Sequence, residues 1–367
     1  MEISNFYKNK KVLVTGHTGF KGSWLTIWLN ELGADVVGYA LDHKTEKDNY
    51  IVSGIKDRCS SYINDIRDYD KLLDILQKEE PEIIFHLAAQ PLVRESYNNP
   101  RETYETNIMG SVNILEAIRQ TTSVKTVVMI TSDKCYENKE LERAYHEEDD
   151  LGGYDPYSSS KASAELVIDA YRRSFLLDRG VGIASVRAGN VIGGGDWSSD
   201  RLIPDCIQAL IENRDIEIRN PMATRPWQHV FEPLSGYLWL GYLLDKDYEK
   251  YSQAWNFGPN SENIINVGKV VDKIIDFWGA GNWVDFSKDK INKKHEATLL
   301  SLDINKAANL LRWKPALDID QALKLTVDWY KNTNINYDFC VKQLEEYIEI
   351  ANQKNIAWAN DLSGVKL

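Results

Sequence analysis

Cysteine is scarce in this sequence, and long apolar runs are missing. The cysteines are scattered through 367 residues without metal-ligand spacing, at Cys59, Cys135, Cys206 and Cys340. This usage argues against a disulfide framework and indicates reduced thiols in the cytoplasm. No apolar run approaches the ~18 to 20 residues of a membrane span, and the opening residues MEISN lack the regions of a signal peptide. We therefore expect a cytoplasmic protein with no membrane partner and no metal site.

Basic residues are too few for a nucleic-acid-binding protein. The chain has 43 lysines and arginines against 55 aspartates and glutamates, a formal net charge of −12 and a pI near 5.1. A basic face is needed to bind a phosphate backbone, so nucleic acid is not expected as a partner. The length allows a sizeable core and predicts two lobes.

A glycine-rich turn lies near the start of the sequence. Residues 11–15 (KVLVT) have the pattern of a strand, and apolar residues recur at helical spacing over 24–32. Between them, Gly16 permits a tight turn, Gly19 lets backbone N–H groups approach a pyrophosphate, and Gly22 lets the helix pack on the strand. The alternative is a purely structural strand-to-helix turn. We predict a dinucleotide site formed by Gly16, Thr18, Gly19, Phe20, Lys21 and Gly22.

The type of dinucleotide depends on the end of the next strand, predicted at 35–39. A carboxylate there would hold the adenosine ribose of NAD. Asp42 has about the right distance from the glycines but lies two positions beyond the usual one. Lys21 and Lys44 could accommodate a 2′-phosphate. We predict NAD, with NADP as the alternative.

Strands and helices alternate through the first half of the chain. The predicted strands are 11–15, 35–39, 62–63, 82–86, 124–130 and 182–186, and the predicted helices are 24–32, 68–78, 100–120 and 156–177. This alternation predicts an α/β fold, a doubly wound parallel sheet of the Rossmann type, with ligands at the C-terminal strand ends.

The second half of the sequence is less regular. The segments 189–201 and 219–229 carry Gly, Pro, Trp and Arg with little periodicity, as expected of a smaller C-terminal substrate-binding lobe. The predicted domains are a Rossmann domain over 1–187 with returning segments near 229–259, a substrate lobe over 188–228 and 260–335, and a C-terminal tail over 336–367.

Polar and small residues follow several predicted strands. The third strand is followed by Asp65 and Ile66, which could meet the adenine, and the fourth by Leu87, Ala88, Ala89 and Gln90. The fifth ends at Thr131 and continues as Ser132, Asp133 and Lys134. For Asp133 or Lys134 alone, a solvated loop is the better interpretation. The nucleotide turn on the same rim favours a reacting group instead.

Tyr157 and Lys161 lie one helical turn apart in the segment YDPYSSSK, residues 154–161. A tyrosine ordinarily titrates near ~10. An ammonium one turn away and a nearby oxidised nicotinamide would both favour the phenolate. The alternative is a chance YxxxK pattern on a surface helix. With the glycine turn upstream, we predict that Tyr157 is a base and that both residues contact the cofactor.

Five sequence blocks carry a family resemblance: 16–24 (GHTGFKGSW), 88–94 (AAQPLVR), 131–136 (TSDKCY), 187–197 (RAGNVIGGGDW) and 225–230 (RPWQHV). Together they resemble the extended short-chain dehydrogenase/reductase family and, within it, the CDP-glucose 4,6-dehydratases. Related dTDP-sugar dehydratases usually carry Asp-Glu where this chain has Asp133-Lys134, which points to the CDP-glucose branch. The likeness spans about residues 10–330 and is lowest over 42–60.

The resemblance implies a lyase that converts CDP-D-glucose to CDP-4-dehydro-6-deoxy-D-glucose in deoxysugar biosynthesis, as for lipopolysaccharide O-antigen. Tyr157 would take the proton of the 4-hydroxyl as hydride leaves C4 for NAD, with Ser132 bonded to the same oxygen. Lys134 and Asp133 would divide C5 deprotonation and C6 protonation, and hydride would return to C6. The implied catalytic set is Ser132, Asp133, Lys134, Tyr157 and Lys161.

The resemblance also implies the substrate-binding residues and the assembly. It assigns Arg225 to the pyrophosphate and Asn190 to the sugar-phosphate end, within the set Gln90, Asn190, Arg201, Leu202, Arg219 and Arg225. A guanidinium suits phosphate because it donates two bonds at once. The helices beginning near Pro100 and Pro156 pair subunits in the family, which predicts a homodimer or homotetramer.

Two other functions remain open at this stage. A nucleotide-sugar 4-epimerase shares the glycine turn, Ser132 and the Tyr157/Lys161 pair but needs no acid/base pair beside C5 and C6. A non-catalytic dinucleotide-sensing protein on the same fold is the distant alternative, and the intact Tyr157, Lys161 and Ser132 argue against it.

Overall fold

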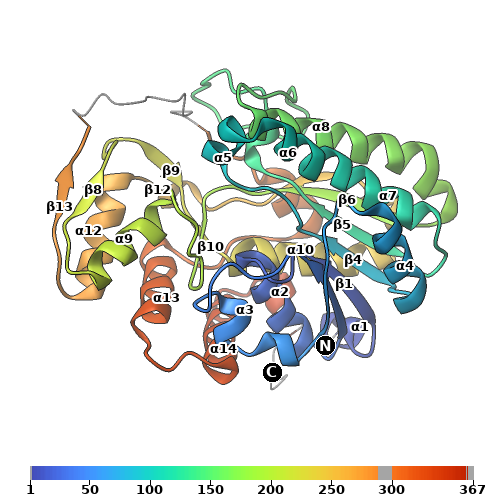
Figure 1. The fold of residues 1–367 in the computed structure, drawn as a ribbon, viewed down its shortest axis with the longest axis horizontal. Helices are drawn as coiled ribbons and strands as arrows, with labels where there is room; N and C mark the ends of the chain where they lie inside the picture. The colour runs from blue at the N-terminus through green and yellow to red at the C-terminus, as the bar shows by residue number, and fades with distance from the viewer. Residues whose placement is uncertain (1, 288–299, 361, 363–367) are drawn as a thin grey trace.

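A parallel sheet of seven strands forms the centre of the computed structural model, which describes residues 2–287, 300–360 and 362 (Figure 1). The strands run in the spatial order β11-β6-β5-β4-β1-β2-β3, so the order reverses between β1 and β4. Their bounds are β1 Lys11–Thr15, β2 Asp35–Ala40, β3 Ser60–Ile63, β4 Ile83–His86, β5 Thr126–Ile130, β6 Gly182–Arg187 and β11 Ala254–Asn256. The predicted doubly wound Rossmann-type fold is confirmed, and a returning segment supplies the edge strand β11.

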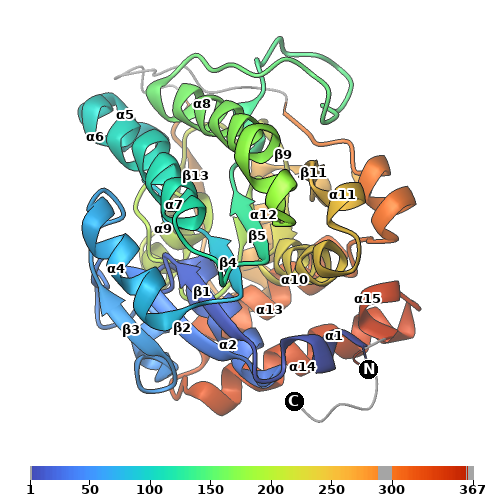
Figure 2. The same ribbon diagram turned by 90° about the vertical axis from the view of Figure 1, so that its right-hand side faces the viewer.

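Helices cover both faces of the sheet because successive strand side chains point to opposite faces. Val12 and Val14 pack into the core below α2 and α10, whereas Leu13 packs into a second core below α4, α7 and α8. Figure 2 shows these two helical layers on either side of the strands. The helix bounds are α2 Phe20–Glu31, α4 Tyr69–Glu79, α7 Gly110–Arg119, α8 Pro156–Tyr171 and α10 Phe231–Lys246.

The two longest predicted helices are interrupted in the structure. The segment predicted over 100–120 consists of α6 Pro100–Tyr104, a π-helical turn at Glu105–Met109, and α7. The helix predicted over 156–177 leaves α-helical geometry after Tyr171, in a second π-helical turn at Arg172–Leu176. A π-turn adds one residue without changing hydropathy periodicity enough to be predicted from sequence.

A second, smaller lobe is built from short strand pairs and helices, to the left of the sheet in Figure 1. Its strand pairs are β7 Val191–Ile192 with β10 Gln228–His229, β8 Ile216–Ile218 with β13 Trp283–Asp285, and β9 Thr224–Pro226 with β12 Ile264–Asn266. Its helices are α9 Leu202–Ile211, α12 Val267–Trp278 and α13 Ile319–Lys331. Residues 288–299 of the predicted substrate lobe lie outside the described residues.

The C-terminal segment packs onto helix α2. It forms α14 Tyr337–Gln353 and α15 Ala357–Asn360, and the Tyr337 hydroxyl donates to Glu31 Oε1 at 2.7 Å. Tyr347 stacks on Trp358 with ring centroids 5.3 Å apart, and both pack against Trp28 of α2. The segment therefore supports the helix whose N-terminus faces the candidate site. Residues 361 and 363–367 of the predicted tail lie outside the described residues.

The remaining helices are short: α1 Glu2–Tyr7, α3 Asn49–Val52, α5 Val93–Asn98 and α11 Tyr248–Tyr251. In the described part of the chain, no helix has both the length and the apolar character needed to cross a membrane.

Candidate active site

A cavity of about 1180 Å³ lies where the strand order reverses, at the C-terminal ends of the parallel strands. Ligands bind at this position in doubly wound sheets. Its volume exceeds that of most single-ligand sites, so a dinucleotide and a second ligand can both be accommodated. All but one of the predicted site residues line it, namely Gly16, Thr18, Gly19, Phe20, Lys21, Gly22, Asp65, Ile66, Leu87, Ala88, Ala89, Ser132, Asp133, Lys134, Tyr157, Lys161, Asn190, Arg201, Leu202, Arg219 and Arg225.

The exception is Gln90, whose side chain is not among those lining the cavity. Its amide nitrogen donates to Leu92 O at 3.1 Å and to Thr103 Oγ1 at 2.9 Å. The structure therefore gives Gln90 a role in shaping the turn after β4 and does not bring it to the predicted substrate site.

The glycine turn leaves room for a ligand against its backbone. Gly16 has φ +76°, and a Cβ there would lie 2.9 Å from Ala88 N. A Cβ at Gly22 would lie 2.1 Å from Gly16 O, so only glycine allows α2 to start this close to β1. Gly19 caps α2 without a side-chain hydrogen bond. The first N–H groups of α2 are therefore available to an anion at the mouth of the helix.

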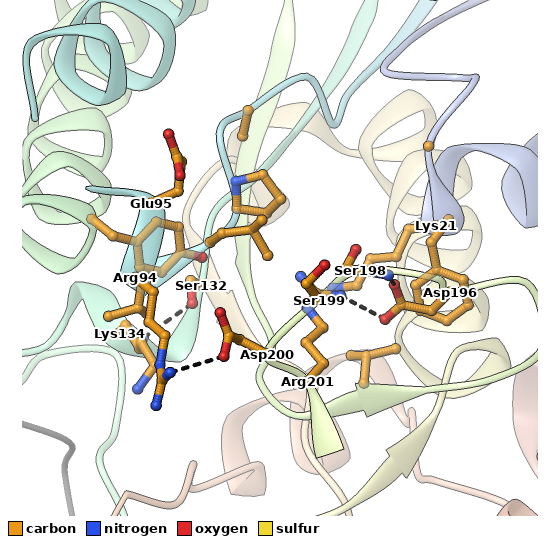
Figure 3. Close-up of a pocket in the computed structure, with 18 of the residues that line it drawn as sticks. Lys21, Arg94, Glu95, Ser132, Lys134, Asp196, Ser198, Ser199, Asp200 and Arg201 are labelled. Atoms are coloured by element: carbon orange, nitrogen blue, oxygen red, sulfur yellow. Dashed lines mark hydrogen bonds and ion pairs between the residues drawn. The ribbon is translucent and has the colours of Figure 1, made fainter. Parts of the chain in front are cut away.

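Acidic side chains mark the far end of the cavity, beyond β2. Asp42 and Asp48 both line it. Asp42 accepts from His43 Nδ1 at 2.7 Å, and the hydrogen bonds that the His43 ring donates to Glu46 and Asp42 raise the pKa of His43. Lys44 also lies at this end of the cavity. Lys21 lies at the other end, near Asp196 (Figure 3), where Asp133 and Asp196 act to raise its pKa.

Ser132, Asp133 and Lys134 form a short turn directly after β5. Ser132 Oγ donates to Asp133 Oδ1 at 2.9 Å, and Lys134 N donates to Ser132 Oγ at 3.2 Å. Asp133 is buried against Gly189, where a Cβ would lie 1.9 Å from its Oδ2. Lys134 lies on the side of the cavity nearer Arg94 (Figure 3). The predicted acid and base are thus adjacent in sequence but differ in burial.

Tyr157 and Lys161 occupy the first turns of α8, which begins at Pro156 with Asp155 as N-cap. They are 7% and 6% exposed. Burial raises the pKa of Tyr157 to about 12, opposed by a hydrogen bond with Ser132. Burial also lowers the pKa of Lys161 to about 8. The protein by itself therefore disfavours the predicted phenolate, because desolvation outweighs the effect of neighbouring cations.

Two lysines face the cavity without a protein partner. Neither Lys21 nor Lys161 makes a side-chain hydrogen bond or ion pair with any residue in the described part of the chain. Burial, followed by Arg201, lowers the pKa of Lys21 to about 7. Partly desolvated ammonium groups of this kind fit an anionic or hydroxyl-bearing ligand, as the diphosphate and ribose of a dinucleotide would supply. Sequence reasoning placed Lys21 at the cofactor but gave no signal of its perturbed titration.

Arginines from both lobes also line the cavity. Arg201 Nη1 pairs with Asp196 Oδ2 at 2.8 Å. Asp200 Oδ1 accepts from Arg94 Nη1 at 2.8 Å (Figure 3) and from Arg219 Nη2 at 3.3 Å, so it links the two guanidinium groups. Sequence reasoning did not single out Arg94 or Asp200.

A family model for GDP-mannose 4,6-dehydratase matches residues 13–326. The chain belongs to this dehydratase family. A CDP-glucose 4,6-dehydratase of Salmonella typhimurium is 50% identical over 333 residues, which cover 89% of this chain and 92% of the relative. The human dTDP-D-glucose 4,6-dehydratase is 26% identical, covering 92% of this chain and 95% of its own.

Solved structures share the fold of this dehydratase family member. A dTDP-glucose 4,6-dehydratase of Streptomyces venezuelae, solved with NAD bound, has a TM-score of 0.73 at 22% identity, with 88% of this chain and 97% of the other covered. A UDP-glucose 4-epimerase of Thermotoga maritima, solved with UDP-glucose, has a TM-score of 0.75 at 22% identity, with 88% and 98% covered. Because dehydratases and epimerases match equally well, the fold alone does not separate the two reactions.

Proposed function

We propose that this protein is an NAD-dependent CDP-glucose 4,6-dehydratase, a hydro-lyase. The observation that carries the proposal is the meeting of Ser132-Asp133-Lys134 with Tyr157 and Lys161 in one cavity large enough for cofactor and substrate. The 50% identity to the Salmonella CDP-glucose 4,6-dehydratase supports this reaction over 4-epimerisation. An epimerase needs the Tyr157/Lys161 pair but has no use for an acid and a base at positions 133 and 134.

The residues that would hold NAD are those of the Gly16–Gly22 turn together with Tyr157 and Lys161, which line the same cavity. When bound, NAD supplies a hydride acceptor for C4 and a hydride donor for C6. Asp42 and Asp48 at the adenosine end would repel a 2′-phosphate, and of the two lysines predicted to tolerate one, only Lys44 lies there. These charges support NAD over NADP.

The chain's own residues carry the proton transfers. Tyr157 as the phenolate accepts the proton of the sugar 4-hydroxyl and becomes the neutral phenol, and the adjacent Lys161 ammonium favours the phenolate that starts the step. Ser132 turns its hydroxyl from Asp133 to the sugar oxygen. The 4-ketone acidifies the C5 hydrogen, so that water can leave from C6 while Lys134 and Asp133 divide the removal and delivery of protons.

The substrate diphosphate is met by the arginine wall of the second lobe. Arg225 is half-buried at the cavity and donates from Nη1 to Thr224 O at 2.8 Å, which fixes the guanidinium. Arg201 and Arg219 pair with Asp196 and Asp200 and line the same cavity. We assign the diphosphate to Arg225 because it lines the cavity at a half-buried position and the family resemblance places it there.

Replacing Arg225 should weaken substrate binding with little effect on the cofactor. The variant Arg225→Ala loses a charge-assisted bond worth about 1.5 to 3 kcal/mol, so KM for CDP-glucose should rise roughly ten- to a hundredfold. Arg219→Ala, at a more exposed guanidinium, is the matched control and should change KM less. An unchanged KM in Arg225→Ala with a normal NAD content would place the diphosphate elsewhere.

The function is tested by incubating the purified protein separately with CDP-, dTDP-, UDP- and GDP-glucose. CDP-glucose should give CDP-4-keto-6-deoxyglucose without net formation of NADH, and the other three should react more slowly. A product that is only the C4 epimer, or stoichiometric release of free NADH, would contradict the proposal.

The assembly is proposed to be a homodimer or homotetramer in the cytoplasm. Exposed apolar side chains lie on the adjoining helical segments α6 to α7 and α8 to its π-turn, at Tyr104, Met109, Leu166 and Phe175. Large apolar side chains exposed on adjoining helices support a subunit contact at these helices. The four cysteines are unpaired, consistent with a reducing compartment. Deoxysugar supply to lipopolysaccharide O-antigen is the corresponding biological role.

A further inference from the structure

A buried carboxylate lies one helical turn beyond Lys161 on α8. Glu165 is 3% exposed. One of its oxygens accepts from Thr131 Oγ1, and the other accepts from Ser185 Oγ at 2.7 Å and from Arg187 Nη2 at 2.8 Å. The proton transfers described above do not use Glu165. A buried carboxylate needs hydrogen-bond partners of this kind. The positions of these partners in the fold indicate a role in positioning the reacting groups.

The partners of Glu165 come from the elements that carry the reacting groups. Thr131 immediately precedes Ser132 at the end of β5, and Ser185 and Arg187 lie on β6, which leads to Asn190. Glu165 itself is on α8 with Tyr157. One carboxylate therefore ties the Tyr157 helix to the Ser132 strand end.

The Glu165 carboxylate also raises the pKa of Lys161 and so favours its ammonium form. Burial lowers the pKa of Lys161, and Cys135 followed by Glu165 oppose this effect. The Lys161 charge in turn lowers the pKa of Lys21 on α2 and of His86 on β4. Burial holds the pKa of His86 at about 3, so this imidazole is neutral, and Lys21 disfavours a second ammonium. Among these groups Glu165 is the carboxylate. Residues four apart on a helix are neighbours, so its charge lies close to the Lys161 side chain.

We propose that Glu165 is a positioning residue that keeps Lys161 in its ammonium form and holds Tyr157 in register with Ser132. This inference rests on the proposed function, because it assumes that Lys161 assists Tyr157 in the reaction. Arg187 is the ion partner that holds the Glu165 carboxylate in place. It donates from Nη1 to the Tyr136 hydroxyl at 2.8 Å and pairs with Glu165 in a site where both side chains are under 5% exposed.

The proposal is tested with Glu165→Gln, which keeps the size of the side chain and removes its charge. A partner carboxylate raises the pKa of Lys161, so activity that needs the ammonium is present below that pKa and lost above it. Without Glu165, the alkaline limb of the kcat/KM profile for CDP-glucose should move to lower pH by about one unit or more. Ser185→Ala is the matched control, since it removes a hydrogen bond to the same carboxylate but keeps the charge, and its alkaline limb should not move.

Glu165→Gln leaves Arg187 buried without its ion partner and could prevent folding. The double variant Glu165→Gln/Arg187→Met removes both charges. Because the double variant also lacks the Glu165 carboxylate, its alkaline limb should move in the same direction, to lower pH.

A second readout does not depend on turnover. In full-length protein with ¹³C-labelled lysine side chains, the Lys161 resonance, assigned by its loss in Lys161→Met, should titrate at lower pH in the Glu165 variants than in the wild type. An unmoved Lys161 titration and an unmoved alkaline limb, with only a lower kcat, would reduce Glu165 to a packing role. Failure of the wild type to dehydrate CDP-glucose would instead contradict the proposed function and leave the titration result standing.

Discussion

Tyr157→Phe is expected to lose almost all turnover of CDP-glucose while retaining the fold and a normal content of NAD. The substitution removes one oxygen from a buried ring that is otherwise unchanged, so packing along α8 is kept. The lost group is the acceptor of the 4-hydroxyl proton. General acid–base groups typically contribute about 10² to 10⁴-fold, and kcat should fall within that range.

Tyr154→Phe is the matched control for this result. Tyr154 also lines the cavity but is 78% exposed and lies before the start of α8. Removal of its hydroxyl should leave kcat within a few-fold of wild type. A near-normal rate in Tyr157→Phe would exclude this phenol as the base and would undermine the assignment of the α8 dyad.

Lys134→Met is expected to stop the reaction after the first oxidation. The Tyr157 step does not require Lys134, so CDP-4-keto-glucose and reduced cofactor should accumulate on the enzyme. Elimination of water requires removal of the C5 proton, and solvent deuterium should therefore no longer enter at C5. Mass spectrometry of the quenched enzyme-bound sugar measures both outcomes.

Lys139→Met serves as the control because Lys139 is a nearby exposed lysine outside the main cavity, paired with Asp150 at 2.7 Å. It should behave as wild type. If Lys134→Met still eliminates water at close to the normal rate, Asp133 or a bound water carries the step. Asp133→Asn then becomes the variant that should stall.

The central sheet was predictable from sequence because its strands are short apolar runs between strong turn signals. β1 and β5 are almost fully buried along their length, and the predicted strands fall within two residues of the observed bounds. The cavity residues followed from the same logic, since polar residues after parallel strands meet at one edge of the sheet. Because β4 lies between β1 and β5, the glycine turn and the Ser132 turn flank the end of β4 at the same edge of the sheet.

What the sequence did not reveal depends on contacts between distant residues. Gln90 lies in a family-typical block, but its amide is satisfied locally by Leu92 and Thr103 and does not reach the cavity. The ion pair between Asp200 and Arg94 joins residues 106 positions apart. The unfavourable pKa of Tyr157 could not be predicted either, because it arises from the degree of burial that the two lobes impose together.

The most direct test of the account follows a single hydrogen. CDP-glucose carrying deuterium at C4 is incubated with the protein in ordinary water, and the product is analysed by NMR. A 4,6-dehydratase moves the hydrogen taken from C4 to C6 within the same sugar, so we predict CDP-4-keto-6-deoxyglucose with deuterium in its C6 methyl group. Deuterium retained at C4 of an epimerised hexose, with no 6-deoxy product, would contradict the central claim.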